Sequence, residues 1–368
     1  MAGMTESYGM ASLVVPERWE DVTPGWMTAA LSRHHPDARV ADVELLLRDD
    51  GTNRRARFGL TYSAGSGPKT VFVKAESDVP GRREIHARNG NLFNEALLYR
   101  SGIALPIEHP LAYAAVVDEA KLDYVIVMED LVGRGADPRH ALRPFTAEQV
   151  AGGLRGLARL HSGFWGRIER EAVLEWVQPF LPTDGLLRPM RKAAPMGLER
   201  ARDALPDEVT KLTGDALVDK LWADYLSALT TGPQTLLHGD PHIGNTYTLP
   251  DGEVGFLDWQ VVRRGSWAHD VGYFLQGAFT EDDRRRYEVD LVEEYRNALD
   301  VPASERPTAG EAWLRYRATA VHGLTMWIVT LLSDVHEYER SLALVRRYAS
   351  AFAELDTPAA VESLNVRR

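Results

Sequence analysis

Residues 237–247 read Leu-His-Gly-Asp-Pro-His-Ile-Gly-Asn-Thr-Tyr, and the rest of the chain is interpreted from them. An apolar lead-in ends in a loop that holds Asp240 and, five residues later, Asn245. Downstream, residues 253–260 predict a short strand that delivers Asp258 at its end. Asp240 can accept the proton of an attacking hydroxyl, while Asn245 and Asp258 offer the hard oxygen ligands that magnesium prefers. The pattern therefore predicts phosphoryl transfer.

An ordinary turn between two strands, with an unrelated acid nearby, is the simpler interpretation of this stretch. Four fixed residue types at set spacing arise by chance in a chain of this length roughly one time in a thousand, given average composition. The chemical interpretation is therefore favoured over the simple turn.

Two motifs carry a resemblance to a known family. Residues 238–240, His-Gly-Asp, with Asn245, and then residues 257–260, Leu-Asp-Trp-Gln, resemble the aminoglycoside phosphotransferase and choline kinase-like superfamily of small-molecule kinases. The Asp-Trp-Gln triplet is similar to the branch that includes the ecdysteroid-kinase-like enzymes. The resemblance spans about residues 42–332 and implies an α+β, bilobal, protein-kinase-like fold. It also implies ATP and Mg²⁺ as cofactors and a hydroxyl of a small molecule as the phosphoryl acceptor.

The resemblance implies a division of the chain as well. Residues 1–40 would form an N-terminal lead and a bracing helix that opens at Thr23. Residues 41–131 would form a small nucleotide-binding lobe, an antiparallel sheet plus one helix. Residues 132–368 would form a large, mostly helical catalytic lobe with a substrate-binding insertion at 166–232. Five runs have the composition of the small lobe's strands: residues 43–47, 57–62, 70–74, 113–117 and 124–128.

A lysine and a glutamate in the small lobe are expected to form an ion pair. Residues 71–74, Val-Phe-Val-Lys, end in Lys74, which resembles the third-strand lysine that contacts the α- and β-phosphates of ATP. The helical stretch 91–100 supplies Glu95 as its partner. A lysine at the end of a strand is usually only solvated, so the pairing rests on the resemblance. Residues 76–90, between the two, are expected to form a long polar loop.

Other nucleotide contacts are implied by position. In the resembled family the turn at residues 49–55 covers the ATP phosphates, which here points to Thr52 and Asn53. The turn holds a single glycine, so a plain hairpin explains it equally well. The resemblance places adenine against three positions at the end of the last small-lobe strand: Met128, Glu129 and Leu131.

Several large-lobe residues are expected to support the site. Asp270 resembles a family aspartate that braces the catalytic loop, and His238 is assigned to the same supporting layer. His161 lies on an apolar helix face with no acid partner suggested, which favours a purely structural role. Four residues of the insertion could line an apolar acceptor site or belong to the core: Trp176, Phe180, Met190 and Met196. Helices are expected at about residues 281–299, 309–332 and 334–355.

The composition limits the class of protein. The chain has 368 residues, of which 45% are hydrophobic and 26% charged, which suits a globular protein with two lobes. It contains no cysteine, which excludes disulfides and thiolate metal sites and fits the cytoplasm. With 53 acidic against 42 basic residues the net charge is −11, which argues against nucleic acid as a partner.

No membrane association is expected. The longest apolar run, residues 318–332, is too short to span a bilayer, and residues 1–15 lack the pattern of a signal peptide. Residues 1–15 are expected to be disordered or loosely held. The expected partner is a small-molecule hydroxyl acceptor, and the expected assembly is a monomer or a homodimer.

Two alternatives to a small-molecule kinase stay open. A nucleotide-binding pseudokinase that acts as a scaffold would normally have lost its base or a metal ligand, and this chain keeps both. A protein kinase is disfavoured by the Asp-Trp-Gln triplet and by the lack of an Ala-Pro-Glu stretch. The acceptor stays open, because members of the superfamily act on aminoglycosides, choline-like amines, sterols, macrolides, sugars and hydroxyacyl thioesters.

Overall fold

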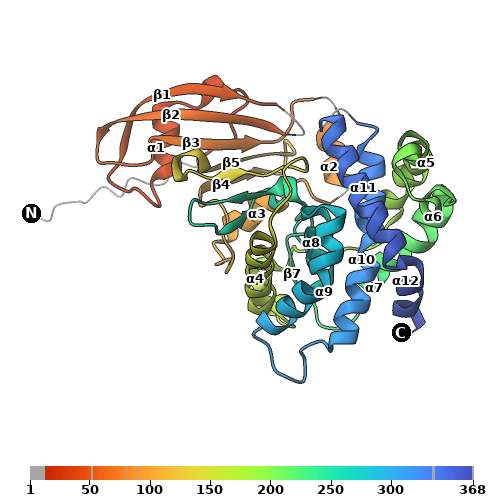
Figure 1. Ribbon diagram of the computed structural model, residues 1–368. Helices are drawn as coiled ribbons and strands as arrows, with labels where there is room; N and C mark the ends of the chain where they lie inside the picture. The colour runs from red at the N-terminus through yellow and green to blue at the C-terminus, as the bar shows by residue number, and fades with distance from the viewer. Residues whose placement is uncertain (1–12, 51–52, 80, 89, 334–335, 367–368) are drawn as a thin grey trace, which may run out of the picture. The chain divides into compact units, whose positions relative to one another are not determined.

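The computed structural model describes residues 13–50, 53–79, 81–88, 90–333 and 336–366, drawn in Figure 1. The chain divides into two compact units. Unit 1 comprises Met1–Gly102 and Pro110–Arg134, and unit 2 comprises Ile103–His109 and Gly135–Arg368. The expected boundary after residue 131 lies three residues before the observed one, and residues 103–109, expected in the small lobe, belong to unit 2.

The α+β class is confirmed, because unit 1 carries one five-stranded antiparallel sheet in the order β1-β2-β3-β5-β4, and helices dominate unit 2. The strands are β1 (Arg39–Arg48), β2 (Arg54–Ala64), β3 (Thr70–Ala75), β4 (Ala112–Asp118) and β5 (Asp123–Glu129). Each of the five overlaps a predicted run and extends beyond it. Alternation along β5 sends Val125 and Val127 into one core cluster and Ile126 into a second cluster.

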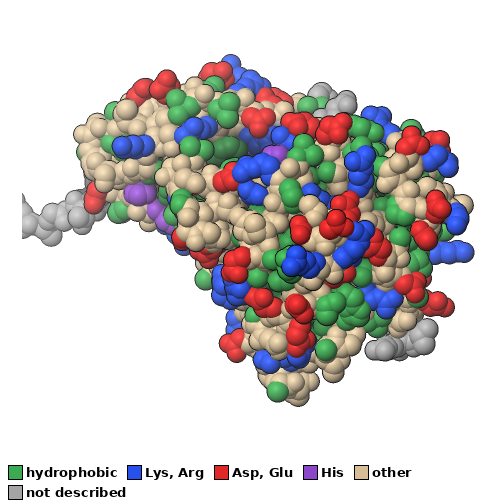
Figure 2. All heavy atoms as spheres, viewed as in Figure 1, with side chains coloured by type: hydrophobic (Ala, Val, Ile, Leu, Met, Phe, Trp, Pro, Cys, Tyr) green, Lys and Arg blue, Asp and Glu red, His purple; other side chains and the backbone are tan. Residues whose placement is uncertain are grey.

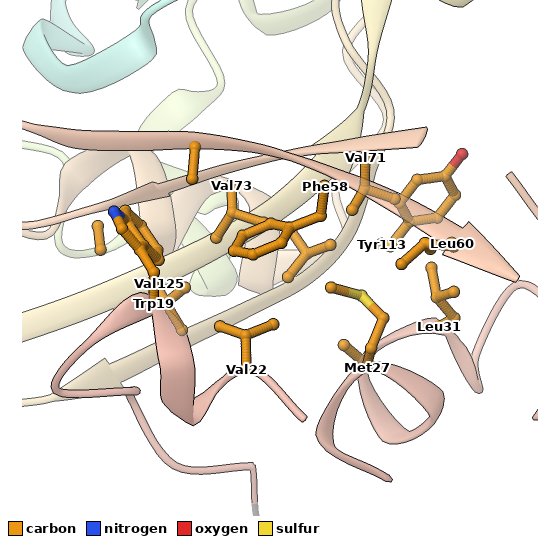
Figure 3. Close-up of a cluster of buried hydrophobic side chains, with 14 of the residues drawn as sticks. Trp19, Val22, Met27, Leu31, Phe58, Leu60, Val71, Val73, Tyr113 and Val125 are labelled. Atoms are coloured by element: carbon orange, nitrogen blue, oxygen red, sulfur yellow. The ribbon is translucent and has the colours of Figure 1, made fainter. Parts of the chain in front are cut away.

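The first core cluster lies under the N-terminal bracing helix, which the structure confirms as α1 (Pro24–Leu31). Thr23 caps it by accepting a hydrogen bond from the Trp26 N–H at 3.2 Å. Figure 3 shows Met27 and Leu31 of α1 directed at side chains of the sheet. Burial of one such side chain contributes about 1.5–3 kcal/mol, so α1 is an integral part of unit 1. Two residues of the stretch that was expected to be loose also pack here: Val15 is buried in the cluster and Leu13 packs against it.

The second core cluster lies under α3 (Asn94–Ser101), and this face of the sheet carries Met128, one of the residues expected to contact the nucleotide. Phe72 and Lys74 of β3 point to this face because Val71, Val73 and Ala75 point to the other. Gly102 ends α3 in the left-handed conformation, at φ 68°, as is usual for a glycine after a helix. The sheet register therefore directs Lys74 toward α3.

The expected polar loop at residues 76–90 is wrong in part, because it contains the helix α2 (Arg82–Arg88). Several of the polar residues that suggested a loop have hydrogen-bond or ion-pair partners. Glu76 is buried and accepts hydrogen bonds from the Ser77 N–H and from His86 Nδ1 at 2.7 and 3.0 Å. Arg83 pairs with Asp123 at 3.0 Å. The described part of unit 1 therefore contains three α-helices, whereas only two were expected, the bracing helix and one helix of the small lobe.

Unit 2 is built around α10 (Ala309–Thr330), whose central residues are buried and which packs against α5, α8, α11 and α12. The helices are α4 (Ala147–Phe164), α5 (Asp184–Ala201), α6 (Asp207–Thr210), a π-helical turn at Ala216–Trp222, α7 (Ala223–Ala228), α8 (Ala268–Ala278), α9 (Glu281–Ala298), α11 (Tyr338–Glu354) and α12 (Thr357–Val366). No helix was predicted at the position of α12. The helix predicted from residue 334 corresponds to α11, which begins at Tyr338.

The insertion contains a helix that runs through two prolines. Pro189 and Pro195 lie inside α5, which continues through both. Its buried face packs on α10 so closely that a Cβ atom at Gly197 would lie 2.2 Å from the carbonyl oxygen of Ile328. Tertiary packing therefore outweighs the local cost of the prolines.

The four candidate acceptor-site residues of the insertion separate into two groups. Phe180 and Met190 are buried, and the Phe180 ring lies edge-on to His269 with ring centroids 5.2 Å apart. Trp176 is half-buried, and Met196 is exposed. The core interpretation therefore holds for Phe180 and Met190.

Two small antiparallel sheets in unit 2 position the loop that begins at residue 238. One pairs β7 (Thr235–Leu237) with β10 (Arg263–Gly265). The other has the order β6-β8-β9, formed by Asp137–Pro138, Thr246–Thr248 and Val254–Phe256. The loop is therefore anchored at both ends, because it leaves β7 and enters β8.

The surface of unit 2 is covered with mixed charge. Figure 2 shows acidic and basic side chains interspersed over the face in view. Many form ion pairs within a helix, such as Arg296 with Glu293 and Arg202 with Glu199. Such exposed pairs contribute little to stability. No helix in the described part of the chain is long and apolar enough to cross a membrane.

Candidate active site in unit 2 and ion pair in unit 1

Gly239 fixes the path of the loop that carries Asp240. Its φ is 85°, in the left-handed region that favours glycine. A Cβ atom there would lie 2.1 Å from the carbonyl oxygen of Val261. The backbone therefore makes a turn at this position that only glycine permits, and the turn presents Asp240.

Asp270, in the first turn of α8, supports this loop by accepting hydrogen bonds from its backbone. Its Oδ2 accepts the His238 N–H at 2.7 Å, and its Oδ1 accepts the Gly239 N–H at 3.0 Å. The side chain is fully buried. Burial is the largest single influence and opposes ionisation, but the hydrogen bond and charge of His161, together with the charges of His269 and His238, outweigh it and hold the pKa of Asp270 below its ordinary value. The structure thus brings Asp270 to the loop, as the resemblance implied.

His161 has an acid partner, which the sequence did not suggest. Its Nε2 lies 3.2 Å from Asp270 Oδ2, and its Nδ1 lies 2.7 Å from the hydroxyl of Tyr295. A histidine that accepts from a tyrosine through Nδ1 donates through Nε2, so its orientation is fixed. The expectation that His161 has no acid partner was wrong. Its role is to orient Asp270.

His238 connects the catalytic loop to the segment that carries Asp258. Its Nδ1 accepts the Asp240 N–H at 3.3 Å, and its Nε2 donates to the carbonyl oxygen of Leu257 at 3.0 Å. The ring packs on Trp259 with centroids 4.6 Å apart. The buried His238 side chain therefore holds both segments in place.

Asn245 and Asp240 are in direct contact. The Asn245 amide donates to the Asp240 carbonyl oxygen at 2.9 Å and to Asp240 Oδ2 at 3.2 Å. Because its Nδ2 is used in this way, the amide presents Oδ1 for another interaction. The Asp240 side chain keeps 32% of its surface exposed, so a small molecule can reach the carboxylate.

Asp258 follows β9 in an unusual backbone conformation. Its φ is 64° and its ψ 68°, a left-handed conformation that aspartate tolerates better than most residues. Leu257, just before it, donates its N–H to the Asn245 carbonyl oxygen at 2.9 Å, which ties the two segments together. Burial, and then the charge of Asp258, raise the pKa of Asp240 well above its ordinary value.

The donor set fits magnesium on substrate phosphates. Within the part of the chain that the structure describes, no three His, Cys, Asp or Glu residues form a metal cluster. Magnesium in phosphoryl-transfer enzymes usually takes only one or two carboxylates and completes its shell with phosphates and water. The carboxylate of Asp258 and the amide oxygen of Asn245 match this requirement. Repulsion between Asp240 and Asp258 is also what a bound cation would relieve.

Three aromatic residues around this loop had no predicted role in the site: Tyr273, His242 and Trp327. Tyr273, on α8, interacts electrostatically with Asp240, and burial raises the pKa of this tyrosine well above its ordinary value, so its hydroxyl keeps its proton. His242 is buried, and its ring lies edge-on to Trp327 with centroids 5.0 Å apart. Burial lowers the pKa of His242 to about 3. The histidine two residues after Asp240 was a signal, but Tyr273 and Trp327 offered none.

Lys74 and Glu95 form the expected ion pair in unit 1. Nζ and Oε2 lie 2.6 Å apart, and both side chains are buried, at 6% and 3% exposure. Buried charges of opposite sign at this distance hold each other in place. The pair therefore fixes the position of the Lys74 ammonium group on the sheet face that α3 covers.

The other expected nucleotide residues of unit 1 stay predictions. Thr52 lies outside the described residues. The Asn53 amide donates to the Tyr124 hydroxyl at 2.9 Å and is buried, so its side chain points into unit 1. Glu129 donates its N–H to the Leu111 carbonyl, and its carboxylate accepts from Leu111 and Arg134. Met128 is buried against the α3 face, and Leu131 begins a short 3₁₀ turn.

Comparison with known proteins gives both a family and a fold. The family model described as "Phosphotransferase enzyme family" (APH) matches residues 91–309. A solved structure of a candidate aminoglycoside phosphotransferase from Ralstonia eutropha is 14% identical, with TM-score 0.50, over 90% of this chain and 97% of that one. Spectinomycin phosphotransferase APH(9)-Ia, solved with ADP and spectinomycin, is 13% identical, with TM-score 0.49, over 90% and 98%.

A third structure is choline kinase LicA from Streptococcus pneumoniae, 13% identical, with TM-score 0.46, over 86% and 94% of the two chains. No curated protein matches this chain. The likeness to the Ralstonia structure confirms the expected protein-kinase-like fold.

Proposed function

We propose that this chain, which belongs to the phosphotransferase enzyme family, transfers the γ-phosphoryl group of ATP to a hydroxyl of a small molecule with the help of magnesium. The observation that carries the proposal is the loop braced by Asp270, which holds Asp240 in contact with Asn245. This is the arrangement that transfer to an alcohol requires: a base for the acceptor and oxygen ligands for a metal.

Each residue has a distinct task in this proposal. Asp240 accepts the proton of the acceptor hydroxyl as the oxygen attacks the γ-phosphorus. Asn245 and Asp258 would hold magnesium, which supplies charge neutralisation on the phosphates when it is bound. Lys74, oriented by Glu95, would neutralise the α- and β-phosphates.

A screen of ATP consumption tests the proposal. Purified protein is incubated with ATP, with and without magnesium, and with a panel of aminoglycosides, amino alcohols, sugars and sterols. We expect magnesium-dependent ATP consumption that one class of acceptor stimulates. Nucleotide binding without consumption for every acceptor would favour the scaffold instead. Phosphorylation of a protein substrate in place of small molecules would favour a protein kinase.

Substitutions in the ion pair of unit 1 are expected to affect the free energy of unfolding and the turnover differently. Lys74→Met leaves the buried Glu95 carboxylate without its partner and is expected to cost about 3–5 kcal/mol of unfolding free energy. The double variant Lys74→Met/Glu95→Gln removes both charges and is expected to regain most of that stability. Both variants should lose about 10²-fold in turnover, because neither stabilises the phosphates. Urea denaturation and steady-state kinetics provide the two readouts. Wild-type turnover in the stable double variant would refute the role of Lys74.

The two metal-ligand residues are expected to differ in strength. A carboxylate binds a doubly charged hard cation more tightly than a neutral amide does. Asp258→Ala should therefore weaken the binding of ADP in the presence of magnesium more than Asn245→Ala, by about tenfold more. Titration calorimetry with and without magnesium measures both variants. Equal ADP affinity of the wild type in the two conditions would contradict the proposed metal site.

A further inference from the structure

One ring nitrogen of His242 is committed to the loop itself. His242 Nδ1 accepts the backbone N–H of Gly244 at 3.0 Å. A Cβ atom at Gly244 would lie 2.7 Å from Cε1 of this ring, so the glycine is what lets the ring approach. An imidazole that accepts through Nδ1 and is neutral carries its proton on Nε2. The fold therefore selects the Nε2–H tautomer.

The Nε2–H has no hydrogen-bond partner among the residues that the structure describes. The nearby acid oxygen, Asp240 Oδ2, lies 3.9 Å away, beyond hydrogen-bonding distance. Only 7% of the His242 side chain is exposed, and the Trp327 ring stands edge-on to it. The Nε2–H is thus a donor on a largely buried ring that keeps a little exposed surface, and a hydrogen-bond partner that enters from outside would stabilise it. The geometry suggests that a ligand atom fills this need.

One oxygen atom can serve both groups. Because Nε2 and Oδ2 are 3.9 Å apart, an oxygen about 2.8 Å from each would see them at an angle of about 90°, which suits a hydroxyl that donates one hydrogen bond and accepts another. A water molecule or an alcohol has this pairing of one donor with acceptor lone pairs. A tertiary amine or a quaternary ammonium group does not.

We propose that His242 binds the reacting oxygen of the acceptor: Nε2–H donates to it while Asp240 Oδ2 accepts its proton. This rests on the proposed function of the site. In the transfer step, the O–H proton moves to Oδ2 and the oxygen forms a bond to the γ-phosphorus. The bond from the γ-phosphorus to the β–γ bridging oxygen breaks, and ADP leaves with that electron pair. His242 keeps its proton throughout and fixes where the attacking oxygen lies.

Two substitutions separate this role from that of a loop cap. In His242→Asn, Oδ1 stands near the position of Nδ1 and keeps the bond to Gly244, but nothing reaches the position of Nε2. In His242→Gln, Nε2 stands near the original donor position, but the cap is lost. If His242 binds the acceptor, the His242→Asn variant should have a turnover about tenfold below that of the wild type, the equivalent of one hydrogen bond. The His242→Gln variant should recover most of the wild-type turnover. A role confined to capping predicts the opposite order.

The assay is hydrolysis of Mg·ATP with water as the only acceptor, so no acceptor needs to be known. We measure kcat, KM for ATP and melting temperature for the wild type, both variants and Asp240→Asn. A lower kcat in His242→Asn, with KM for ATP unchanged and a rate recovered in His242→Gln, supports the proposal. Equal rates in the wild type and His242→Asn, with Asp240→Asn inactive, would overturn the proposed role of His242 and leave the proposed function of the site in place. Full hydrolysis by Asp240→Asn would overturn the proposed function, because the base would then lie elsewhere. If the wild type does not hydrolyse ATP with water alone, the same four proteins are compared with the acceptor class that stimulates ATP consumption, and the same order of rates is expected.

Discussion

Replacing Asp240 with asparagine is expected to lower phosphoryl transfer by about 10²–10⁴-fold, the usual effect of losing a general base, while leaving the affinity for ATP nearly unchanged. The carboxylate acts on the acceptor hydroxyl and does not hold the nucleotide. The substituted side chain can still accept the hydrogen bond from Asn245, because an amide oxygen replaces Oδ2 at the same position. The loop should therefore keep its shape.

Steady-state kinetics and calorimetry with ATP measure the two quantities for Asp240→Asn. Asp251→Asn is a matched control, since Asp251 is an exposed acid in the turn between β8 and β9. It should keep both wild-type turnover and wild-type affinity. Wild-type turnover in Asp240→Asn would show that the base lies elsewhere.

The second large effect is expected at Asp270. Asp270→Ala removes the acceptor of two backbone N–H groups, those of His238 and Gly239, and the partner of His161. Removal of one member of such a buried network typically costs about 3–5 kcal/mol. We expect this loss in the free energy of unfolding, together with a fall in turnover, because the loop no longer fixes Asp240.

Urea denaturation compares the wild type with Asp270→Ala and Asp270→Asn. Asparagine keeps one acceptor oxygen and should be the less destabilised of the two variants. The prediction fails if Asp270→Ala unfolds at the same urea concentration as the wild type. It also fails if the alanine variant keeps full activity.

The sequence predicted site residues best where several polar residues stand at fixed spacing within a short stretch. The loop from His238 to Asn245 and the later Asp258 could be assigned because their residue types are rare in this combination. Lys74 and Glu95 could be paired because the resemblance implies a lysine on the third strand and a glutamate on the next helix. The structure places these two side chains 2.6 Å apart.

Contacts between distant residues could not be predicted in the same way. His161 and Asp270 are 109 positions apart, and neither residue signals the other. Tyr273 reaches Asp240 only because α8 packs beneath the loop. The same reason explains Phe180, for which the sequence left an acceptor role and a core role open and which lies against His269 in the core. Side chains of this kind acquire their roles from packing.

Local polarity was misleading in one part of unit 1. Residues 76–90 are rich in charged groups, which favoured a loop, yet α2 forms there. Its charges are not simply solvated, because His86 pairs with Glu76 and Arg83 with Asp123. A sequence reads as a loop when its polar residues have no visible partners, and here the partners lie on other elements.

The most direct test of the account is to look for the product itself. Wild-type protein is incubated with Mg·ATP and the acceptor class that stimulates ATP consumption, and the mixture is followed by phosphorus NMR and mass spectrometry. The account predicts a phosphate monoester on a hydroxyl of the acceptor, formed one for one with ADP and absent with Asp240→Asn. ADP and inorganic phosphate alone, with no phosphate ester on any acceptor, would contradict it.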